Sequence, residues 1–551
     1  MQIYWKFLYT SCTKDTLANI CVCKSAAHKK QRREEGMELE SLILAVIVFV
    51  SLYYLFRLLN FNLNPRVKRE SGTNSEQLGF QLPPGSTGWP IIGETLEYLS
   101  TAKQGVPEKF IADRRTKHSS SVPCKVFKTS LLQESMAVLC TAAGNKFLFS
   151  NENKLVKSWW PANFEKIFAN SEKTDTTQES IRLRKVLSPF LKPDALHRYI
   201  GAMDEVTKQH LNMYWSCSSS VDYVKEEDQS VIIKVHPLAK KYTFTLACKL
   251  FLNIEDPKLV AKLEEPIRHI SSGFISLPIN FPGTKFNRAI RASKQIKKEI
   301  EEMVKQRRID LHPHLSDTKN SNHHYHDQDL LSRLLVETYS DGKELMTESD
   351  IANKLYGLIV GAYDNISTTL VSIIMFLSKL PHVYDAVLKE QMQIAESKAE
   401  GELLNWEDLQ KMKYSWSVAC EALRLLPPIL GTFREAITDF SYEGYIIPKG
   451  MKLHWNMYAT HKNPEYFPEP EKFDPSRFQG QGPAPYSYVP FGGGPRMCPG
   501  KEYARFKILV FMHDIVTRFK WEMVFPDEKM IMDPVLVPTK GLNIRLFPHP
   551  S

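Results

Sequence analysis

The stretch PFGGGPRMCPG, residues 490–500, decides the fold of this chain. Three consecutive glycines and an arginine stand before a single cysteine, Cys498, and a Pro–Gly pair follows it. Glycine allows the backbone to approach a bulky neighbour closely, and it lets backbone N–H groups point at the cysteine sulfur. An amphipathic helix is expected after Gly500, and a thiol next to a helix N-terminus is biased toward the thiolate. The loop therefore predicts that Cys498 is a metal ligand or a nucleophile.

The composition of the whole chain favours one large catalytic unit. The 551 residues are 43% hydrophobic and 24% charged, and neither a Gly/Ser-rich linker nor an internal repeat divides them. The formal net charge of +9 comes without a dense Lys/Arg stripe interleaved with aromatics, so no nucleic-acid partner is expected. The nine cysteines contain no CxxC pair, which predicts reduced thiols in a cytosol-like compartment.

An apolar segment near the N-terminus predicts a membrane anchor. Residues 41–56 are uncharged and mostly apolar, and the side chain of Arg57 can reach the membrane surface, which extends the span toward the ~20 residues that a bilayer requires. Basic residues follow this segment and mark the cytosolic side. A buried core helix is the alternative. We expect a signal anchor at 37–61, a linker at 62–80 and a cytosolic catalytic domain at 81–551.

The first 36 residues conflict with this topology. The stretch KKQRREE, residues 29–35, would place positive charge on the translocated side of the membrane. The stretch MELESLILAV begins at Met37, and its acidic start suits that side. We therefore interpret 1–36 as an extension and hypothesise that the functional chain begins at Met37.

Most of residues 100–430 have helical periodicity, and a strand-like composition appears at 432–455, so the chain is predicted to be mainly α with a small β region. The segment 354–380 is apolar on all sides, which predicts a long helix through the core. Asp364 and Asn365 interrupt it. A buried carboxylate needs a partner, so this pair indicates a functional kink or site.

These features together resemble the cytochrome P450 family. The residues that match its haem-binding signature, F-x-x-G-x-R-x-C-x-G, are Phe491, Gly494, Arg496, Cys498 and Gly500. Glu421 and Arg424 fit the family's E-x-x-R pair, which is weak evidence by itself, and Arg477 fits the third member of the associated Glu/Arg/Arg lock. The likeness extends over roughly residues 80–549, in order and in spacing.

The resemblance implies the cytochrome P450 fold, with haem b between the long core helix and the cysteine loop. Cys498 would be the axial ligand of the haem iron. Arg496 and Arg434 would contact the haem propionates. Arg184 matches the arginine of a W-x-x-x-R element, although Ser180 stands at the tryptophan position. Electrons would come from NADPH through NADPH–cytochrome P450 reductase. The protein would lie at the endoplasmic reticulum membrane, with a single-pass anchor in the lipid.

A finer resemblance is to plant P450s that oxidise triterpenes, such as the β-amyrin 28-monooxygenases. The stretches that resemble this group are residues 148–161, 277–290, 431–440 and 482–505. The likeness implies triterpenoid biosynthesis in plant secondary metabolism: a monooxygenase that uses O2 and oxidises a hydrophobic pentacyclic triterpene of the β-amyrin type, with C-28 as the expected position. The substrate contacts that it implies are Trp159, Trp160, Tyr363, Ile429, Leu430 and Thr432.

The core helix departs from the family pattern at one important position. The family element (A/G)-G-x-(D/E)-T-(T/S) reads here as residues 361–366, GAYDNI, so the acid Asp364 is kept and Asn365 replaces the threonine that helps to deliver protons. An amide can position a water, but it cannot relay a proton as a hydroxyl can. We expect Asp364 and Asn365 to be the catalytic pair, with either an altered proton path or weaker coupling. The alternatives are a haem-thiolate isomerase or dehydratase that needs no O2, a triterpene or diterpenoid oxidase of different regiospecificity, and a membrane-anchored haem-binding protein without enzymatic activity.

Overall fold

The computed structural model describes residues 47–51, 53–54, 81–90, 92–118, 123–168, 187, 190–216, 230–274, 276, 278–316, 329–340, 343–344, 346–533 and 535–549. The chain divides into two compact units, Met1–Gln81 and Leu82–Ser551. In the first unit, the described residues from Ile47 to Tyr54 are helical, and apolar side chains such as Phe49, which is 75% exposed, face outward. The rest of the predicted anchor 37–61, the extension 1–36 and the linker 62–80 lie outside the described residues.

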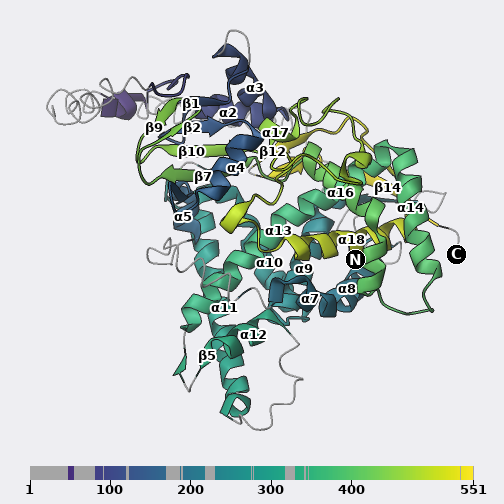
Figure 1. Cartoon of the computed structure of the whole chain (residues 1–551). Coiled ribbons are helices and arrows are strands. Elements are labelled where there is room, and N and C mark those ends of the chain that lie inside the picture. Colours follow the sequence, from purple (N-terminus) through teal and green to yellow (C-terminus); the bar gives the residue numbers. More distant parts are fainter. Residues whose placement is uncertain are drawn as a thin grey trace, which may run out of the picture. The chain divides into compact units, whose positions relative to one another are not determined.

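The second unit is mainly helical, with small sheets at its sides (Figure 1). Its helices are α2 (Thr95–Lys103), α3 (Glu108–Lys117), α4 (Ala142–Ser150), α5 (Ala162–Phe168), α7 (Pro193–Leu196), α8 (Ile200–Tyr214), α9 (Val235–Ala247), α10 (Pro257–Gly273), α11 (Lys285–Ser316), α12 (Leu330–Glu337), α13 (Glu348–Lys379), α14 (Pro381–Glu396), α15 (Trp406–Lys411), α16 (Lys413–Leu425), α17 (Tyr458–His461) and α18 (Lys501–Arg518). Short helical turns are η2 (His197–Tyr199), the π-helical η3 (Cys248–Leu252), η4 (Pro475–Phe478) and η5 (Gly494–Arg496).

The strands are β1 (Val126–Leu131), β2 (Glu134–Leu139), β3 (Val156–Trp159), β4 (Val231–Lys234), β5 (Tyr339–Ser340), β6 (Lys343–Glu344), β7 (Gly431–Ala436), β8 (Phe440–Tyr442), β9 (Tyr445–Ile447), β10 (Lys452–Asn456), β11 (Phe519–Met523), β12 (Met530–Met532), β13 (Leu536–Pro538) and β14 (Asn543–Pro548). The largest sheet has the order β1-β2-β10-β7-β3, and its pairs are antiparallel except for the parallel pair β10–β2. In this sheet β7 pairs with β10 on one side and with β3 on the other, which places Arg434 opposite Leu453 and Ser158.

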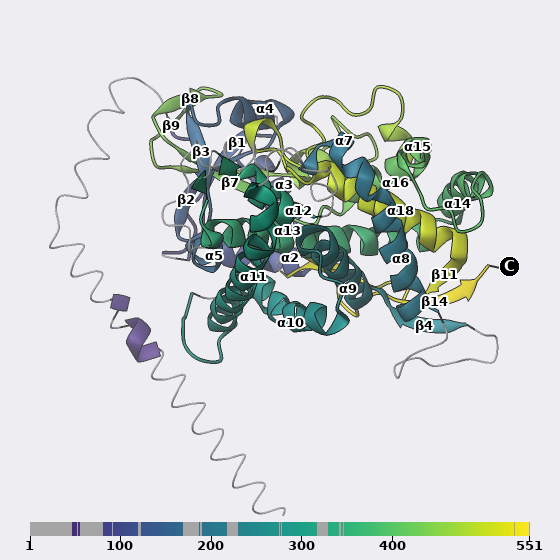
Figure 2. The same cartoon turned by 90° about the horizontal axis from the view of Figure 1, so that it is seen from below.

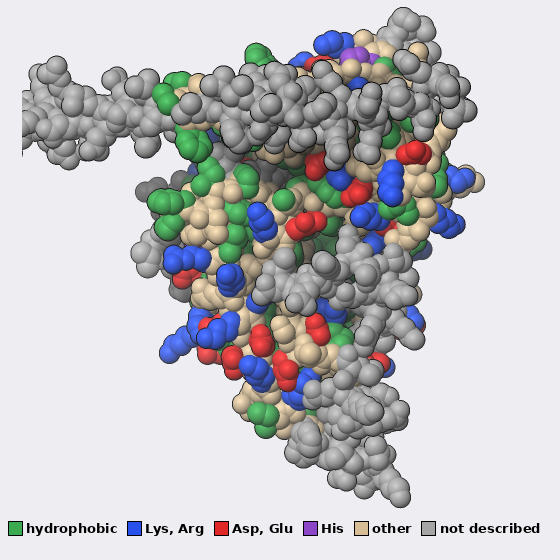
Figure 3. Space-filling view, turned by 90° about the vertical axis from the view of Figure 1, so that its left-hand side faces the viewer, with side chains coloured by type: hydrophobic (Ala, Val, Ile, Leu, Met, Phe, Trp, Pro, Cys, Tyr) green, Lys and Arg blue, Asp and Glu red, His purple; other side chains and the backbone are tan. Residues whose placement is uncertain are grey.

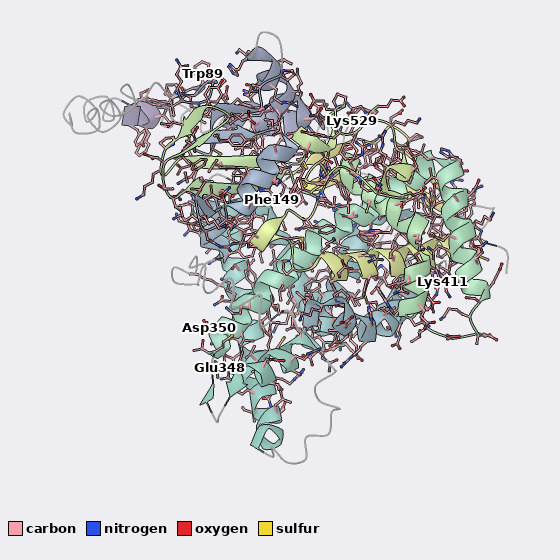
Figure 4. All side chains as sticks on the ribbon, in the orientation of Figure 1. Trp89, Phe149, Glu348, Asp350, Lys411 and Lys529 are labelled. Carbon is pink, nitrogen blue, oxygen red and sulfur yellow. The ribbon has the colours of Figure 1, made fainter. Side chains whose placement is uncertain are left out.

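The long helix α13 crosses the helical region, with α9, α11, α16 and α18 packed against it (Figures 1 and 2). Its sequence fixes both ends. Thr347 and Asp350 form a capping box, in which the Thr347 hydroxyl oxygen accepts from the Asp350 N–H at 3.1 Å and the Asp350 carboxylate accepts from the Thr347 N–H at 3.2 Å. The helix ends at Lys379, two residues before Pro381, which restricts the residue that precedes it. Figure 4 labels Glu348 and Asp350 in its first turn.

α13 is also, among the described residues, the one helix whose length and composition would allow it to cross a membrane. Of its most apolar window, 83% is buried inside the protein, so its apolarity is explained by packing. By contrast, α11 pairs charges of both signs on its outer surface, where Lys305 forms ion pairs with Glu301 and Glu302. Figure 3 shows blue and red side chains intermixed over the lower part of the face in view.

Candidate active site

The glycine-rich loop ahead of α18 packs closely against α4. A Cβ atom on Gly493 would lie 2.4 Å from Cδ2 of Phe149, and one on Gly494, whose φ is +63°, would lie 2.3 Å from the Phe149 carbonyl oxygen. Both distances are shorter than any real carbon contact, so only glycine fits at these positions. The sequence predicted a close approach to a bulky neighbour, and Phe149 is one such neighbour (Figure 4).

The loop brings Cys498 to the wall of a cavity. The Cys498 N–H donates to the Phe491 carbonyl oxygen at 2.8 Å, which closes the turn, and the cysteine side chain is exposed. The cavity measures about 410 Å³. Residues proposed from the sequence that line it are Asn365, Ile429, Thr432, Arg434, Phe491, Arg496, Cys498 and Gly500. Further lining residues include Trp160, Leu358, Ile366, Thr369, Leu423 and Trp455. The wall is thus largely apolar, with one thiol and two guanidinium groups.

α13 presents a regular stripe to this cavity. Gly357, Gly361, Asn365 and Thr369 are spaced four residues apart, which places them on one helical face, and all four line the cavity. A Cβ atom on either glycine would meet nothing within 4 Å, so the helix has an open groove there. The Asn365 side-chain amide donates to the Gly361 carbonyl oxygen at 3.2 Å, and the Thr369 hydroxyl donates to the Asn365 carbonyl oxygen at 2.9 Å.

The neighbouring acid points elsewhere. Asp364 is 5% exposed, and Lys240 of α9 lies 2.9 Å from its Oδ1 in an ion pair. The hydroxyl of Ser271, on α10, donates to its Oδ2. Asp364 does not line the cavity, so the two residues predicted as a catalytic pair face different surroundings. The cost of burying this carboxylate is offset by a cation and a hydroxyl donor.

Tyr363 also faces away from the cavity. Its ring lies 5.8 Å from that of Phe244 on α9, edge to face, and Lys240 Nζ lies 5.3 Å from the ring centre. Burial, first of all, raises the pKa of its phenol. Tyr363 was expected to contact the substrate, but its side chain packs against α9 and does not line the cavity.

The two arginines that line the cavity share one carboxylate. Arg434 lies on β7 and Arg496 in η5, and the Nε atoms of both donate to Glu152, at 2.6 Å and 3.2 Å. Arg434 also donates to the Thr432 hydroxyl at 3.1 Å and to the Phe433 carbonyl at 2.8 Å. Glu152 was missed by sequence reasoning. It stands in a short polar turn, Asn151-Glu152-Asn153, and nothing in that local pattern points to arginines 282 and 344 residues away.

The lining fits the haem that the resemblance implies. A haem has a flat apolar ring, anionic propionates and an iron that accepts a thiolate ligand. The wall supplies apolar side chains such as Trp455 and Phe491, two guanidinium groups and the Cys498 thiol. The open groove at Gly357 and Gly361 adds room for a flat group against α13.

The structure brings the three proposed lock residues together. Arg424 donates to both carboxylate oxygens of Glu421, from Nε at 2.7 Å and from a terminal nitrogen at 2.8 Å, and both side chains are fully buried. Arg477, in η4, places its Nε 3.5 Å from the same carboxylate. The remaining donors of Arg424 satisfy the carbonyl oxygens of residues 461, 470 and 472.

His461 connects this lock to the cysteine loop. Its carbonyl oxygen accepts from Arg424, and its Nε2 accepts from the Val489 N–H at 2.9 Å, one residue before the loop begins. Burial, followed by the charge of Arg424, lowers the pKa of His461 to about 3. The imidazole is therefore neutral at physiological pH and can act as an acceptor.

Two further predicted positions separate from the cavity. Trp159 packs edge to face on Phe433, with ring centres 5.6 Å apart, whereas Trp160 lines the cavity. Leu430 lines a second cavity of about 330 Å³, together with residues of α2 and of the segment between α10 and α11. Arg184 lies outside the described residues.

Trp160 begins an aromatic stack that leads away from the cavity. Its ring stacks on Phe164 at 4.4 Å and 11°, Phe164 stacks on Phe168 at 4.5 Å, and Phe274 lies 4.7 Å from Phe164. Aromatic pairs of this kind each contribute about 0.5–1.5 kcal/mol beyond area burial. This side of the cavity is therefore a rigid apolar wall.

Comparison with known proteins agrees with this geometry. A family model described as Cytochrome P450 matches residues 83–546. The chain is 54% identical over 505 residues to a beta-amyrin 28-monooxygenase of Kalopanax septemlobus, which covers 91% of this chain and 97% of that protein. It is 54% identical over 471 residues to one of Vitis vinifera, covering 86% and 93%, and 52% identical over 510 residues to one of Medicago truncatula, covering 92% and 98%. Among solved structures, the retinoic-acid-bound cyanobacterial CYP120A1 is 27% identical and superposes with a TM-score of 0.70, over 85% of this chain and all of that one.

Proposed function

The chain belongs to the cytochrome P450 family and is a haem-thiolate monooxygenase that receives NADPH-derived electrons through a reductase, and we propose that it oxidises a pentacyclic triterpene of the β-amyrin type at C-28. The observation that carries the proposal is the 52–54% identity, over most of both chains, to relatives named for that reaction. The geometry adds a cavity that combines Cys498 with a rigid apolar wall.

Three residues of the cavity would hold the haem. Cys498 would supply the thiolate ligand to the iron, and Arg434 and Arg496 would supply cations for the propionates. When bound, the haem supplies the activation of O2 and the insertion of one oxygen atom into a C–H bond. Trp455 and Phe491 would exclude water from the ring by their apolar surface.

The rest of the cavity would orient the substrate. Trp160, Leu358, Ile366 and Ile429 offer apolar surface to a fused-ring hydrocarbon skeleton, which has little polarity of its own. The Thr432 hydroxyl accepts from Arg434 and from the Trp455 indole, so its acceptor capacity serves the wall itself. Shape and apolar contact, more than hydrogen bonding, would therefore select the substrate.

Proton supply is the part of the site that differs from the family pattern. Because the Asn365 nitrogen donates to Gly361, its side-chain oxygen is the atom left to accept from a water in the cavity. An amide that accepts can fix a water in place, but it does not pass a proton on. Asp364 is held by Lys240 and Ser271 on the other side of the helix. We infer that water, positioned by Asn365, carries protons in this enzyme, with some loss of coupling.

The proposed location is the endoplasmic reticulum membrane, with the anchor 37–61 in the lipid and the catalytic unit in the cytosol. The outward-facing apolar side chains of Ile47, Phe49 and Tyr53 support this proposal, since they offer a lipid-compatible surface. Carbonate extraction of full-length protein and of a chain that starts at residue 81 would test it. The full-length chain should stay in the membrane pellet, and equal release of both would refute the anchor.

The substrate is tested by producing the chain with a plant reductase in yeast strains that make β-amyrin, α-amyrin or dammarenediol. Mass spectrometry of the extracts should detect β-amyrin oxidised at C-28, as the alcohol, aldehyde or acid, only when the reductase is present. Oxidation at another carbon would refute the regiospecificity and leave the substrate class standing. Turnover without NADPH would refute the oxidative reaction and favour the isomerase or dehydratase chemistry that Asn365 otherwise suggests.

A further inference from the structure

Glu152 is a buried acid whose contacts join the two arginines of the cavity wall. Its side chain is 1% exposed, and its two oxygens are divided between two cations. Oε2 lies 2.6 Å from Nε of Arg434, and Oε1 lies 3.2 Å from Nε of Arg496. A single buried carboxylate therefore connects the two arginines of the cavity wall.

Three separate elements meet at this carboxylate. Glu152 lies in the turn between α4 and β3, which is held by the hydrogen bond from Asn153 N–H to the Val156 carbonyl at 2.6 Å. β3 then pairs with β7, where Ser158 stands opposite Arg434. Arg496 arrives from η5, the turn that leads into Cys498. Glu152 thus joins the sheet to the cysteine loop. Arg434 is 282 residues from Glu152 in the sequence, and Arg496 is 344 residues from it.

The contacts leave each arginine in a defined orientation. Arg434 is 4% exposed, and its Nε is directed at Glu152 while a terminal nitrogen donates to Thr432 and Phe433. Two guanidinium groups that approach one cavity repel each other, and the repulsion is strong where water is scarce. A carboxylate placed between them lowers that repulsion and fixes both planes through charge-assisted hydrogen bonds.

We propose that Glu152 is a positioning residue of the haem site, which holds Arg434 and Arg496 in the orientation that receives the propionates. It would act through the two arginines and would not touch the reacting atoms. The competing interpretation is that Glu152 is only a counterion, which competes with the propionates for the same cations. The two interpretations predict opposite effects, because removing a competitor tightens haem binding and removing a positioning group weakens it.

Glu152→Gln distinguishes them, since glutamine keeps the size of the side chain but has one acceptor oxygen in place of two. One arginine would then face the amide nitrogen, which is itself a donor. We expect haem transfer from the purified holoenzyme to excess apomyoglobin to be about tenfold faster, the factor that corresponds to one lost charged hydrogen bond. We also expect a more positive haem reduction potential, because a negative charge beside the haem edge is gone and the added electron is less opposed.

Glu435→Gln is the matched control. Glu435 follows Arg434 on β7, so its side chain lies on the opposite face of the strand, where it pairs with Lys452 at 3.1 Å and Lys157 at 3.7 Å. This variant removes one carboxylate from β7, the strand that carries Arg434. Its haem transfer rate and its haem reduction potential should both stay at the wild-type values.

Glu152→Asp keeps the charge, and it carries the test if the glutamine variant does not fold. Its shorter side chain cannot span both arginines, so haem transfer should accelerate while the potential stays near the wild-type value. Slower or unchanged haem transfer in Glu152→Gln, or an unchanged potential, would overturn the proposal. The inference rests on the haem of the family, and both measurements are made without substrate, so they stand or fail independently of the proposed triterpene reaction.

Discussion

The Asn365 side-chain amide donates to the Gly361 carbonyl oxygen at 3.2 Å, one turn away on the cavity face of α13. The residue that replaces a proton-relaying hydroxyl is therefore fixed against the helix backbone. One N–H of its amide is used there, and its side-chain oxygen is the acceptor that can hold a water.

Asn365→Thr is expected to improve coupling, because it restores a hydroxyl that can both accept and donate a proton. Peroxide released per NADPH consumed should fall at least a few-fold. This change is small beside the ~100-fold or larger contribution that positioned acid–base groups usually make to a reaction rate. Asn353→Thr, on the same helix but away from the cavity lining, should leave the ratio unchanged. An unchanged ratio in both variants would mean that Asn365 does not limit proton supply.

Removing Lys240 should destabilise the protein by leaving Asp364 without its cation. Breaking a fully buried ion pair costs about 3–5 kcal/mol, and the 20% exposure of the Lys240 side chain reduces this to roughly 1–3 kcal/mol. Urea unfolding of Lys240→Met should show that loss. The double variant Lys240→Met/Asp364→Asn should recover part of it, because no uncompensated charge is then buried. Additive losses in the double variant would contradict a direct interaction.

The two arginines of the lock should differ in their effect. Arg424 is fully buried and grips Glu421 with two nitrogens, whereas Arg477 lies 3.5 Å from the same carboxylate and is 12% exposed. Lysine cannot reproduce a planar two-nitrogen contact. Arg424→Lys should therefore cost about 3–5 kcal/mol and impair haem incorporation, and Arg477→Lys should cost about 1–2 kcal/mol. Equal unfolding free energies for the two variants would be inconsistent with this geometry.

Acid should destabilise the protein through His461. The pKa of His461 is lowered to about 3 by burial, from an unfolded value near 6.5, so the unfolded chain binds one more proton between these limits. The contribution of neutral His461 to the free energy of unfolding is therefore fully present above about pH 6.5. It falls by up to ~1.4 kcal/mol per pH unit as the pH decreases toward 3.

His461→Gln keeps an acceptor for the Val489 N–H. It should reduce the slope of unfolding free energy against pH, because the unfolded chain then binds about one proton fewer. The measurement is the free energy of urea unfolding between pH 5 and 8. His269→Gln serves as a control, because that histidine is exposed. If the slope of His461→Gln equals that of the wild type, His461 is not the group that titrates.

Trp160 and Trp159 offer a matched pair for the substrate wall. Trp160→Leu should weaken substrate binding about tenfold, since a ring face and its stack on Phe164 are lost from the cavity wall. Trp159→Leu removes an equal ring from the contact with Phe433 and should affect stability more than binding. Spectral titration with substrate gives both dissociation constants, and an equal or larger effect at Trp159 would place the substrate elsewhere.

The strongest sequence predictions came from motifs that are local or have fixed spacing. The loop 490–500 predicted a presented cysteine, and Cys498 lines the cavity. The mainly α architecture with a small β region and the core helix over 354–380 are both confirmed, since hydrophobic periodicity over long segments is a dependable signal. Close packing by glycine was also foreseeable, although its partner Phe149 was not.

The directions of single side chains could not be predicted in the same way. Asp364 and Asn365 are adjacent in sequence, yet successive residues on a helix point about 100° apart, so one faces the cavity and the other faces α9 and α10. Trp159 and Trp160 differ for a similar reason, because neighbouring side chains along a strand alternate in direction. Trp159 packs on Phe433, and Trp160 lines the cavity. Glu152 depends on the pairing of β3 with β7, which no local pattern encodes.

The carbonyl contacts of Arg424 have a consequence for local opening. The irregular segment 462–474 lacks strand partners, yet the carbonyl oxygens of Pro470 and Lys472 accept from this buried guanidinium, and that of Pro468 accepts from Arg477. Lifting the segment away would expose a cation whose partners are all internal. The hydrogen-bonded amides of this loop, such as the Phe467 N–H on the Asn463 carbonyl and the Asp474 N–H on the Glu421 carboxylate, should consequently exchange with solvent deuterium nearly as slowly as those of the core helices.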